Sequence, residues 1–579
     1  MTVGGGDGLD PSQRGMVGDT SSAALVAADG TADWWCPGRF DAPPVLDRLL
    51  DPAGACLRVA PKAAGPGAQS YLDGTLVLVT RLSGQESLLD VTDAMPWDGH
   101  RASGRIVRVA RALRGPVEVA IELVPPAGPV WPWSEGVAFA GGTVRCPCPF
   151  VVVSEGRSRV ARASARLDTG EALVVTIDHA DASPLSPDAA ERALARTAAA
   201  WRGFLAGAAL EGPYAEAAAR SAVVARALCA YGAPVSSPVT SLPRVVFGER
   251  NADGRVARPS VAAAWALAAA AVGLAEAADD AVRWLADALD HDAPLPSALA
   301  PDGEAPPTEA VLTGLSGWRR SQPVVAGSNA PERRSAEPAA ALLCAAAELG
   351  GELEARWAGV VAQADWLADH WAAPDASVWD LRGPPRPWVS ARLAAREGLA
   401  RLAERARRRN PLDFDAAGWA AAARDIERSL LHDGVGPDGV LRPLTDALPA
   451  SGQWDAALAR CAWQGPWPAG DHVVRATLDR ARARNEDGGW LVPWPVDLDD
   501  GLPGAEPPSV TATLWWARAA ALTGDVDAAH ERVEAVLALA GPLGLLPEAV
   551  DPRMGMALGN RPSAEAHVAL LSAVASLSA

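Results

Sequence analysis

The first third of the chain carries the two-residue hydrophobic period of β-strands. Over residues 117–123, apolar side chains occupy every second position, as in a strand with one buried face. Glycine and proline residues separate this segment from similar ones, as turns do in an antiparallel sheet. Further strands are predicted over residues 75–82, 105–112, 150–153 and 172–177. We therefore expect an antiparallel β-sandwich over residues 1–185.

The pattern changes at residue 186, where long segments rich in Ala, Leu, Arg and Glu begin. Ser186 is a suitable N-cap, and Pro187 fits the first position of a helix. Helices are predicted over residues 187–209, 214–231, 261–289, 336–349, 352–372, 388–409, 415–431, 470–484, 508–523, 525–541 and 563–577. Eleven or twelve helices joined by Gly/Pro loops suit a double ring, so residues 186–579 are expected to form a second, all-helical domain.

Length and charge narrow the classes of partner. With 579 residues the chain is too long for one ordinary core, which agrees with two domains. The net charge of -18 repels phosphate, so neither nucleic acid nor an anionic membrane is expected as a partner. The uncharged run over residues 259–275 is shorter than the roughly 20 residues of a membrane span and predicts a buried helix. The oligomeric state stays open.

The cysteines and the N-terminus indicate a cytoplasmic protein. Seven cysteines are irregularly spaced, and Cys146 and Cys148 lack the two-residue spacer of a zinc knuckle. The first fifteen residues have no apolar segment of the kind found in signal peptides. We therefore expect reduced thiols, a cytoplasmic location and no metal or other cofactor. The acidic loop over residues 497–500 is interpreted as a solvated turn.

Several stretches along the chain occur in the order found in one enzyme family. They begin with residues 17–34, which end in Ala-Asp-Gly-Thr-Ala-Asp-Trp, and continue at residues 238–251, 314–330, 378–383, 501–506 and 544–551. In this order the chain resembles glycoside hydrolase family 15, which holds glucoamylases, glucodextranases and bacterial trehalases. The resemblance implies a trehalase-like N-terminal β-sandwich, an (α/α)6 barrel of the six-hairpin glycosidase type, and inverting hydrolysis of α-glucosidic bonds in an oligosaccharide or trehalose.

Inverting hydrolysis needs two carboxyl groups about 6.5–9.5 Å apart, one to protonate the leaving oxygen and one to activate water. The resemblance makes Glu548, in the stretch Glu-Ala-Val-Asp, the candidate base. The family's acid is a glutamate directly after a tryptophan, and here Asp380 follows Trp379. Asp380 is one methylene shorter, which disturbs the strict geometry of a general acid. Alternatively, Glu548 is an ordinary loop carboxylate, and Asp380 pairs with Arg382 or caps a helix.

The sugar-binding stretches depart further from the family. The resemblance implies substrate-binding roles, with Trp379 as a wall of the pocket, for Trp379, Arg382, Asp253, Arg255, Trp318 and Glu506. Ser260 and Val261, however, stand where the family has the Arg-Asp pair that holds the terminal glucose. Charge-assisted hydrogen bonds of that kind contribute about 1.5–3 kcal/mol each.

Three functions remain open from the sequence. The first is a divergent glycoside hydrolase that uses Glu548 and Asp380 on a small-molecule or oligosaccharide substrate. The second is a catalytically impaired relative that binds carbohydrate or regulates another process, as the lost Arg-Asp pair suggests. The third is a barrel repurposed for acid–base chemistry on a non-sugar metabolite, in which Arg333 and Arg334 would pair with an acidic substrate.

Overall fold

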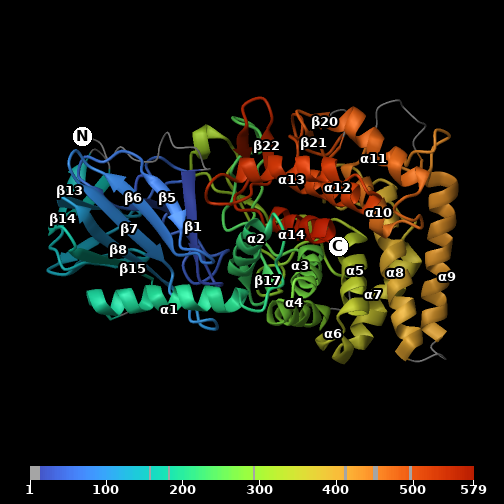
Figure 1. Cartoon of the computed structure of the whole chain (residues 1–579), viewed down its shortest axis with the longest axis horizontal. Coiled ribbons are helices and arrows are strands. Elements are labelled where there is room, and N and C mark those ends of the chain that lie inside the picture. The colour runs from blue at the N-terminus through green and yellow to red at the C-terminus, as the bar shows by residue number, and fades with distance from the viewer. Residues whose placement is uncertain are drawn as a thin grey trace.

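The chain folds into two domains that lie side by side (Figure 1). The computed structural model describes residues 13–155, 158–179, 183–290, 294–409, 414–446, 454–494 and 498–578. Strands make up the N-terminal domain, and helices dominate the rest of the chain. The predicted fold class, an antiparallel β-sandwich followed by an all-helical barrel, is confirmed.

Two antiparallel sheets form the β domain. One has seven strands in the order β1-β2-β3-β4-β9-β14-β13, and the other has eight in the order β10-β11-β12-β15-β8-β7-β6-β5. The alternating segment at residues 117–123 lies in β9, where Val117, Val119 and Ile121 are buried and Glu118 is exposed. Burial of side chains of this size contributes about 1.5–3 kcal/mol each.

The strands of the β domain have the following bounds: β1 (Arg14–Gly18), β2 (Ala23–Ala27), β3 (Thr31–Trp35), β4 (Cys56–Pro61), β5 (Ala68–Tyr71), β6 (Leu78–Ser83), β7 (Leu88–Ala94), β8 (Arg105–Arg114), β9 (Pro116–Val124), β10 (Val130–Trp133), β11 (Gly136–Phe139), β12 (Gly142–Arg145), β13 (Val151–Glu155), β14 (Ser158–Asp168) and β15 (Ala172–Asp178).

Helix α1 (Pro187–Leu205) joins the two domains. Its N-cap is Ser186, whose hydroxyl oxygen accepts a hydrogen bond from the Ala189 amide, as the sequence predicts. Its Ala190 packs against Val107 and Val109 of the eight-stranded sheet, and Figure 1 shows the helix running along the β domain. Strands thus give way to helices between β15 and α1, and because α1 packs on the β domain, the domain boundary after residue 185 stays a prediction.

In the described part of the chain, the other main helices form two concentric rings. The inner ring runs α3, α5, α8, η6 with α10, α12 and α14; each packs against the next, and α14 packs against α3. The outer helices α4, α7, α9, α11, α13 and α2 pack in the same order behind these inner ones. Inner helix α3 is apolar along nearly its whole length; most of its residues are buried against neighbouring elements, whereas Ala264 and Ala271 stay exposed.

The helices of this domain have the following bounds: α2 (Ala215–Ala227), α3 (Pro259–Ala271), α4 (Ala275–Asp287), α5 (Glu337–Glu348), α6 (Glu352–Ala355), α7 (Trp357–His370), α8 (Val389–Arg409), α9 (Phe414–Ser429), η6 (Ala456–Arg460), α10 (Cys461–Gln464), α11 (His472–Asn485), α12 (Val510–Thr523), α13 (Val526–Ala540) and α14 (Ala564–Ser578). Short strand pairs occupy the loops: β16 (Cys229–Ala230) with β17 (Ala233–Pro234), β18 (Ala310–Val311) with β19 (Val325–Ala326), β20 (Glu486–Asp487) with β21 (Trp490–Leu491), and β22 (Ala549–Asp551) with β23 (Met556–Leu558).

Two predicted helical segments are each divided in the structure, and one inner element was not predicted. The segment over residues 352–372 divides at Arg356 into α6 and α7. The single helix predicted over residues 261–289 is two helices, because Gly273 has a φ of +81° and a side chain there would meet the Gly207 carbonyl oxygen. The inner element η6–α10 was not predicted, since it is short and has no sustained hydrophobic period. It nevertheless closes the inner ring.

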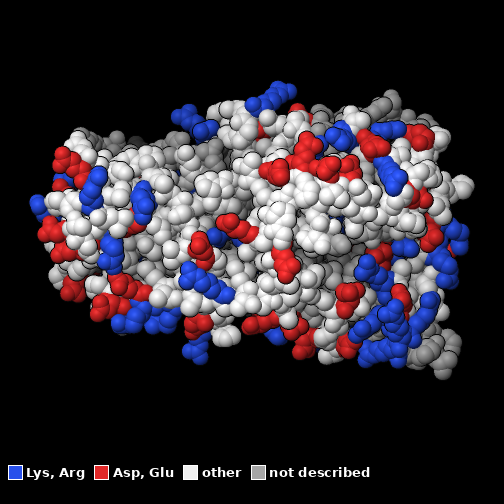
Figure 2. Space-filling view, viewed as in Figure 1, with Lys and Arg blue, Asp and Glu red and all other residues white. Residues whose placement is uncertain are grey.

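Three further features of the fold bear on the predictions. Within the ranges that the structure describes, no helix combines the length and the apolar character that a membrane span needs. All seven cysteines are free thiols, as predicted. Figure 2 shows Lys and Arg side chains gathered over the end of the helical domain that carries α8. There Arg408 pairs with Glu404 one turn earlier, as the i,i+4 spacing predicts.

Candidate active site

A cavity of about 600 Å³ follows the axis of the inner ring. Its lining includes Ser260 and Ala271 near the two ends of α3, and Thr511 and Leu522 near the two ends of α12. The cavity therefore extends along the whole length of these helices. Its volume is typical of small-molecule sites, which measure about 300–1,000 Å³.

Glu548 lines this cavity from the loop between α13 and β22. One carboxylate oxygen accepts a hydrogen bond from Arg244 Nε at 3.3 Å, and the other accepts one from Asn560 Nδ2 at 3.3 Å. Gly559 packs against the same side chain with a φ of +73°, and a Cβ there would lie 2.6 Å from Glu548 Oε2. These contacts fix the direction of the carboxylate, whose side chain stays 15% exposed.

A network of two arginines holds Glu506 beside Glu548. Arg244 Nη1 donates to Glu506 Oε1 at 2.6 Å, and Arg250 Nη1 donates to Glu506 Oε2 at 2.8 Å. Arg250 also pairs with Asp500 at 2.8 Å. Burial alone would lower the pKa of Arg244, but Glu506 and Glu548 raise it above its ordinary value, so this guanidinium stays charged.

Trp379 forms part of the cavity wall, as the resemblance implies. Its indole Nε1 donates to Asp455 Oδ1 at 2.8 Å, and its ring centroid lies 5.2 Å from that of Trp515 and 5.8 Å from that of Trp494. The three tryptophans all line the cavity. Burial raises the pKa of Asp455, whose other oxygen accepts from Ser390. Asp455 thereby fixes the orientation of the indole ring.

Asp380 follows Trp379 but lies outside the residues that line the cavity. Its two oxygens accept hydrogen bonds from Arg333 at 3.0 and 2.8 Å, and Ser297 Oγ donates to one of them at 3.0 Å. Arg258 Nη1 lies 3.5 Å from the other oxygen. Neither oxygen can hold a proton and face a substrate until at least one of these bonds is broken.

The N-terminus of helix α3 contributes three residues to the lining of the cavity. Ser260 and Val261 line the cavity, so the two positions where the family's Arg-Asp pair is missing do face the pocket. Arg258 lines it as well and lies between Asp380 and Glu565, whose Oε1 is 3.8 Å from Arg258 Nε. The guanidinium group of Arg258 is thus present two residues before Ser260, the position at which the family has an arginine.

Three comparisons with known proteins agree with this architecture. A family model described as "Trehalase-like, N-terminal" matches residues 5–128. A trehalase of Mycolicibacterium smegmatis is 30% identical over 97% of this chain and 90% of its own length. A trehalase of Mycobacterium tuberculosis is 29% identical over 96% of the chain and 88% of its own length.

The chain belongs to the glycoside hydrolase 15-type trehalase family. Among solved structures, a bacterial glucoamylase in complex with acarbose shares the fold with a TM-score of 0.70. The match covers 98% of this chain and 94% of that one at 13% sequence identity, so it supports the architecture and not the details of the site.

Within this trehalase-type barrel, the structure brings some predicted site residues together and separates others. Glu548, Trp379, Glu506 and Asp253 line the cavity. Four others are not among the lining residues: Asp380, described above, and Arg255, Trp318 and Arg382. Arg255 points away from the cavity and pairs with Asp253, Trp318 packs into the core of the β domain beneath Arg319, and Arg382 pairs with Glu309 at 2.7 and 2.6 Å.

Arg333 and Arg334 do not offer charge to a ligand in the cavity. Arg333 is engaged by Asp380, and Arg334 lies 5.2 Å over the Trp366 ring. Neither belongs to the lining. The geometry therefore gives no support to the repurposed barrel that would bind an acidic substrate through them.

Several charged groups of this cavity were missed by sequence reasoning. They are Arg244, Arg258, Glu337, Arg460, Arg518 and Glu565. Arg244 lies within the stretch 238–251 that resembles the family, and Arg258 and Glu337 stand close to such stretches. The others lie on inner helices and loops without a local motif, so only the packing of the ring shows which face they occupy. Among the described residues, no group of three His, Cys, Asp or Glu side chains is arranged to hold a metal ion.

Proposed function

We propose that this chain hydrolyses the α-glucosidic bond of trehalose, or of a similarly small α-glucoside, with inversion at the anomeric carbon. The observation that carries the proposal is the Glu548 carboxylate, which two neighbouring side chains orient in a cavity walled in part by tryptophans. The trehalases to which the chain is similar over nearly its whole length support the choice of substrate. The free thiols support a cytoplasmic location for this activity.

Glu548 is the base in this proposal. A base for inverting hydrolysis must be ionised, oriented and open to a water molecule beside the sugar. Arg244 and Asn560 each bind one oxygen, which leaves further lone pairs on the carboxylate free to accept a proton from water. Glu506 is the partner that keeps Arg244 in place.

Asp380 remains the candidate acid, and its hydrogen bonds from Arg333 limit its access to substrate. To donate a proton to the leaving oxygen, the Asp380 carboxyl must exchange at least one bond from Arg333 for a bond to substrate. This exchange costs a charge-assisted pair, so we expect slow turnover compared with a site in which the acid is free. Trp379, held by Asp455, then orders the ring of the sugar next to Asp380.

A second function has specific observations in its favour. Asp380 is hydrogen-bonded to Arg333, and Ser260 and Val261 occupy the cavity-lining positions where the family has its Arg-Asp pair. Both features suit a chain that binds carbohydrate without turnover. Both functions place sugar in the same cavity. They differ only in whether the acid can be released, so hydrolysis itself decides between them.

The deciding experiment measures glucose release from trehalose and maltose, with the anomer followed by NMR. We expect β-glucose as the first product and a loss of about 10³-fold or more in kcat in Glu548→Gln, because the amide cannot accept the proton. Glu531→Gln, which alters an exposed carboxylate on outer helix α13, should retain full activity. Sugar binding by calorimetry without any turnover would favour the second function, and unchanged turnover in Glu548→Gln would refute the assignment of the base.

A further inference from the structure

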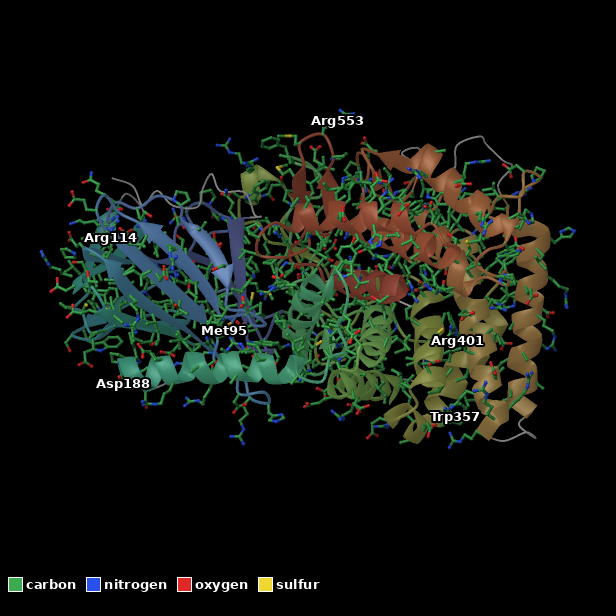
Figure 3. All side chains as sticks on the ribbon, in the orientation of Figure 1. Met95, Arg114, Asp188, Trp357, Arg401 and Arg553 are labelled. Carbon is green, nitrogen blue, oxygen red and sulfur yellow. The ribbon has the colours of Figure 1, made fainter. Side chains whose placement is uncertain are left out.

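The eight-stranded sheet of the β domain has an outer face that helix α1 covers only in part. Ala190 of α1 packs there against Val107 and Val109 of β8 and against Val174 of β15. Figure 3 shows Asp188, in the first turn of α1, beside the β domain. Strands β12, β11 and β10 continue the sheet beyond β15, and their end of the outer face is open to solvent.

The strand register shows which side chains occupy this open end. Trp133 of β10 lies opposite Gly136 of β11, which lies opposite Arg145 of β12. Arg145 in turn lies opposite Thr176, two residues from Val174 under α1. Directly opposite side chains, and those two residues apart in one strand, share a face of the sheet. Trp133 and Arg145 are therefore on the outer face, on the same side as α1.

Two tryptophans, Trp131 and Trp133, dominate this open surface. They are two residues apart in β10, so both project from the outer face, about 6.5–7 Å apart along the strand. Trp131 is 57% exposed and Trp133 36% exposed. On the opposite face of the neighbouring strands, Val137 and Val144 are fully buried in the core of the β domain. The two rings thus stay outside a core that lies directly behind them, and adjacent exposed rings of this size indicate a binding surface.

The neighbouring strand fixes the position of the Trp133 ring. A Cβ at position 136 would lie 2.5 Å from Trp133 Cζ2, so the ring occupies the space above Gly136. Gly136 is buried although it faces outward, because the ring covers it. Arg145 Cζ lies 5.6 Å from the centroid of the same ring. The ring is therefore held against the sheet before any ligand binds, which reduces the entropy lost on binding.

The composition of the surface identifies the class of ligand. Beside the rings it carries the hydroxyl of Thr143 and the guanidinium of Arg145. A nucleic acid is disfavoured by the net charge of -18. A stable protein interface needs a continuous apolar centre, whereas here Ala138 is the one apolar side chain that the register places next to the rings in β11. A sugar chain needs flat aromatic faces for its C–H groups and polar neighbours for its hydroxyls, and this surface offers both.

We propose that Trp131 and Trp133 form a surface site for a linear α-glucan, whose sugar rings stack on the two indoles. The choice of an α-glucan rests on the proposed function, but the site is separate from the barrel, because the residues that line the cavity begin at Ser236. A glucan bound on the β domain holds the protein on the polymer and leaves the cavity free for small α-glucosides.

The test is affinity electrophoresis of the full chain in native gels that contain soluble starch, with Glu548→Gln present so that the polymer is not cleaved. The dependence of mobility on starch concentration gives the Kd. We expect this chain to be retarded, and we expect Trp131→Ala and Trp133→Ala each to raise the Kd about ten-fold, because each removes one stacking surface. If Trp133→Ala does not fold, Trp131→Ala decides, since its side chain is mostly exposed.

Val151→Ala is the matched control. Val151 is 63% exposed on β13, the edge strand of the other sheet, so its loss removes exposed apolar surface away from the two rings and should leave retardation unchanged. No retardation, or equal retardation in both tryptophan variants, would overturn the glucan site. Sedimentation velocity tests another occupant: a dimer that Trp131→Ala converts to a monomer would assign the surface to a second copy of the chain and overturn the proposal.

The outcome for the surface site is distinguishable from that for the barrel. With the native Glu548, both tryptophan variants should hydrolyse trehalose at the unchanged rate, because neither residue lines the cavity. Retardation that depends on the tryptophans, without any hydrolysis, would support the surface site and refute the proposed function. Hydrolysis without retardation would refute the surface site and support the proposed function.

Discussion

Protonation of His567 is expected to weaken the fold and to loosen the loop that carries Glu548. His567 is fully buried on inner helix α14, where its Nε2 accepts a hydrogen bond from the Leu546 amide at 3.1 Å. Its Nδ1 lies 2.9 Å from Ser221 Oγ. Because Nε2 accepts, the ring is neutral and its proton is on Nδ1. A second proton would break the bond to Leu546, two residues before the base.

The size of this effect follows from the pKa of His567. Burial first, and then the charges of Arg220 and Arg561, lower the pKa from 6.5 to about 3. A depressed histidine pKa means that the unfolded chain binds the proton first as the pH falls. Stability is therefore complete above about 6.5 and is lost by about 1.4 kcal/mol per pH unit down to about 3. Between pH 6.5 and 4.5 this single group should cost about 2–3 kcal/mol.

His567→Gln isolates the contribution, because glutamine does not titrate and can still accept from the Leu546 amide and donate to Ser221. Urea unfolding of both proteins at pH 7 and pH 4.5 gives the difference in the free energy of unfolding at each pH. We expect the wild type to lose about 2–3 kcal/mol more than the variant over this interval. Equal losses in the two proteins would refute the assignment of a neutral, buried His567.

Two further predictions concern Arg333 and Asp375, which lie in neighbouring loops joined by hydrogen bonds. Arg333→Met should release Asp380 and raise kcat for trehalose about ten-fold, because a charge-assisted pair no longer competes with the substrate; a fall in kcat would show that Arg333 positions the acid instead. Burial raises the pKa of Asp375 to about 6, so its stabilising effect is complete below about pH 4 and is lost as the pH rises through 6. Asp375→Asn should therefore lose about 2–3 kcal/mol less unfolding free energy than the wild type between pH 4 and pH 7 in urea titrations, and parallel curves would contradict the shift.

The architecture was largely predictable because the spacing of hydrophobic residues within a short segment indicates which of its faces is buried. The alternation in β9 and the long apolar segments of α3, α12 and α14 need no distant information to be recognised. The misses were also local in origin. Gly273 ends α3 through a left-handed turn, and η6–α10 is too short for a periodic pattern to develop.

The site was predictable only where the family resemblance preserved a stretch. It located Glu548, Trp379, Glu506 and Asp253, which all line the cavity. It could not tell that Asp253 uses both of its oxygens on Arg255, since two charged residues close in sequence can pair with each other instead of with a ligand. Nor could it show that Arg333, which is 47 residues before Asp380, reaches that carboxyl.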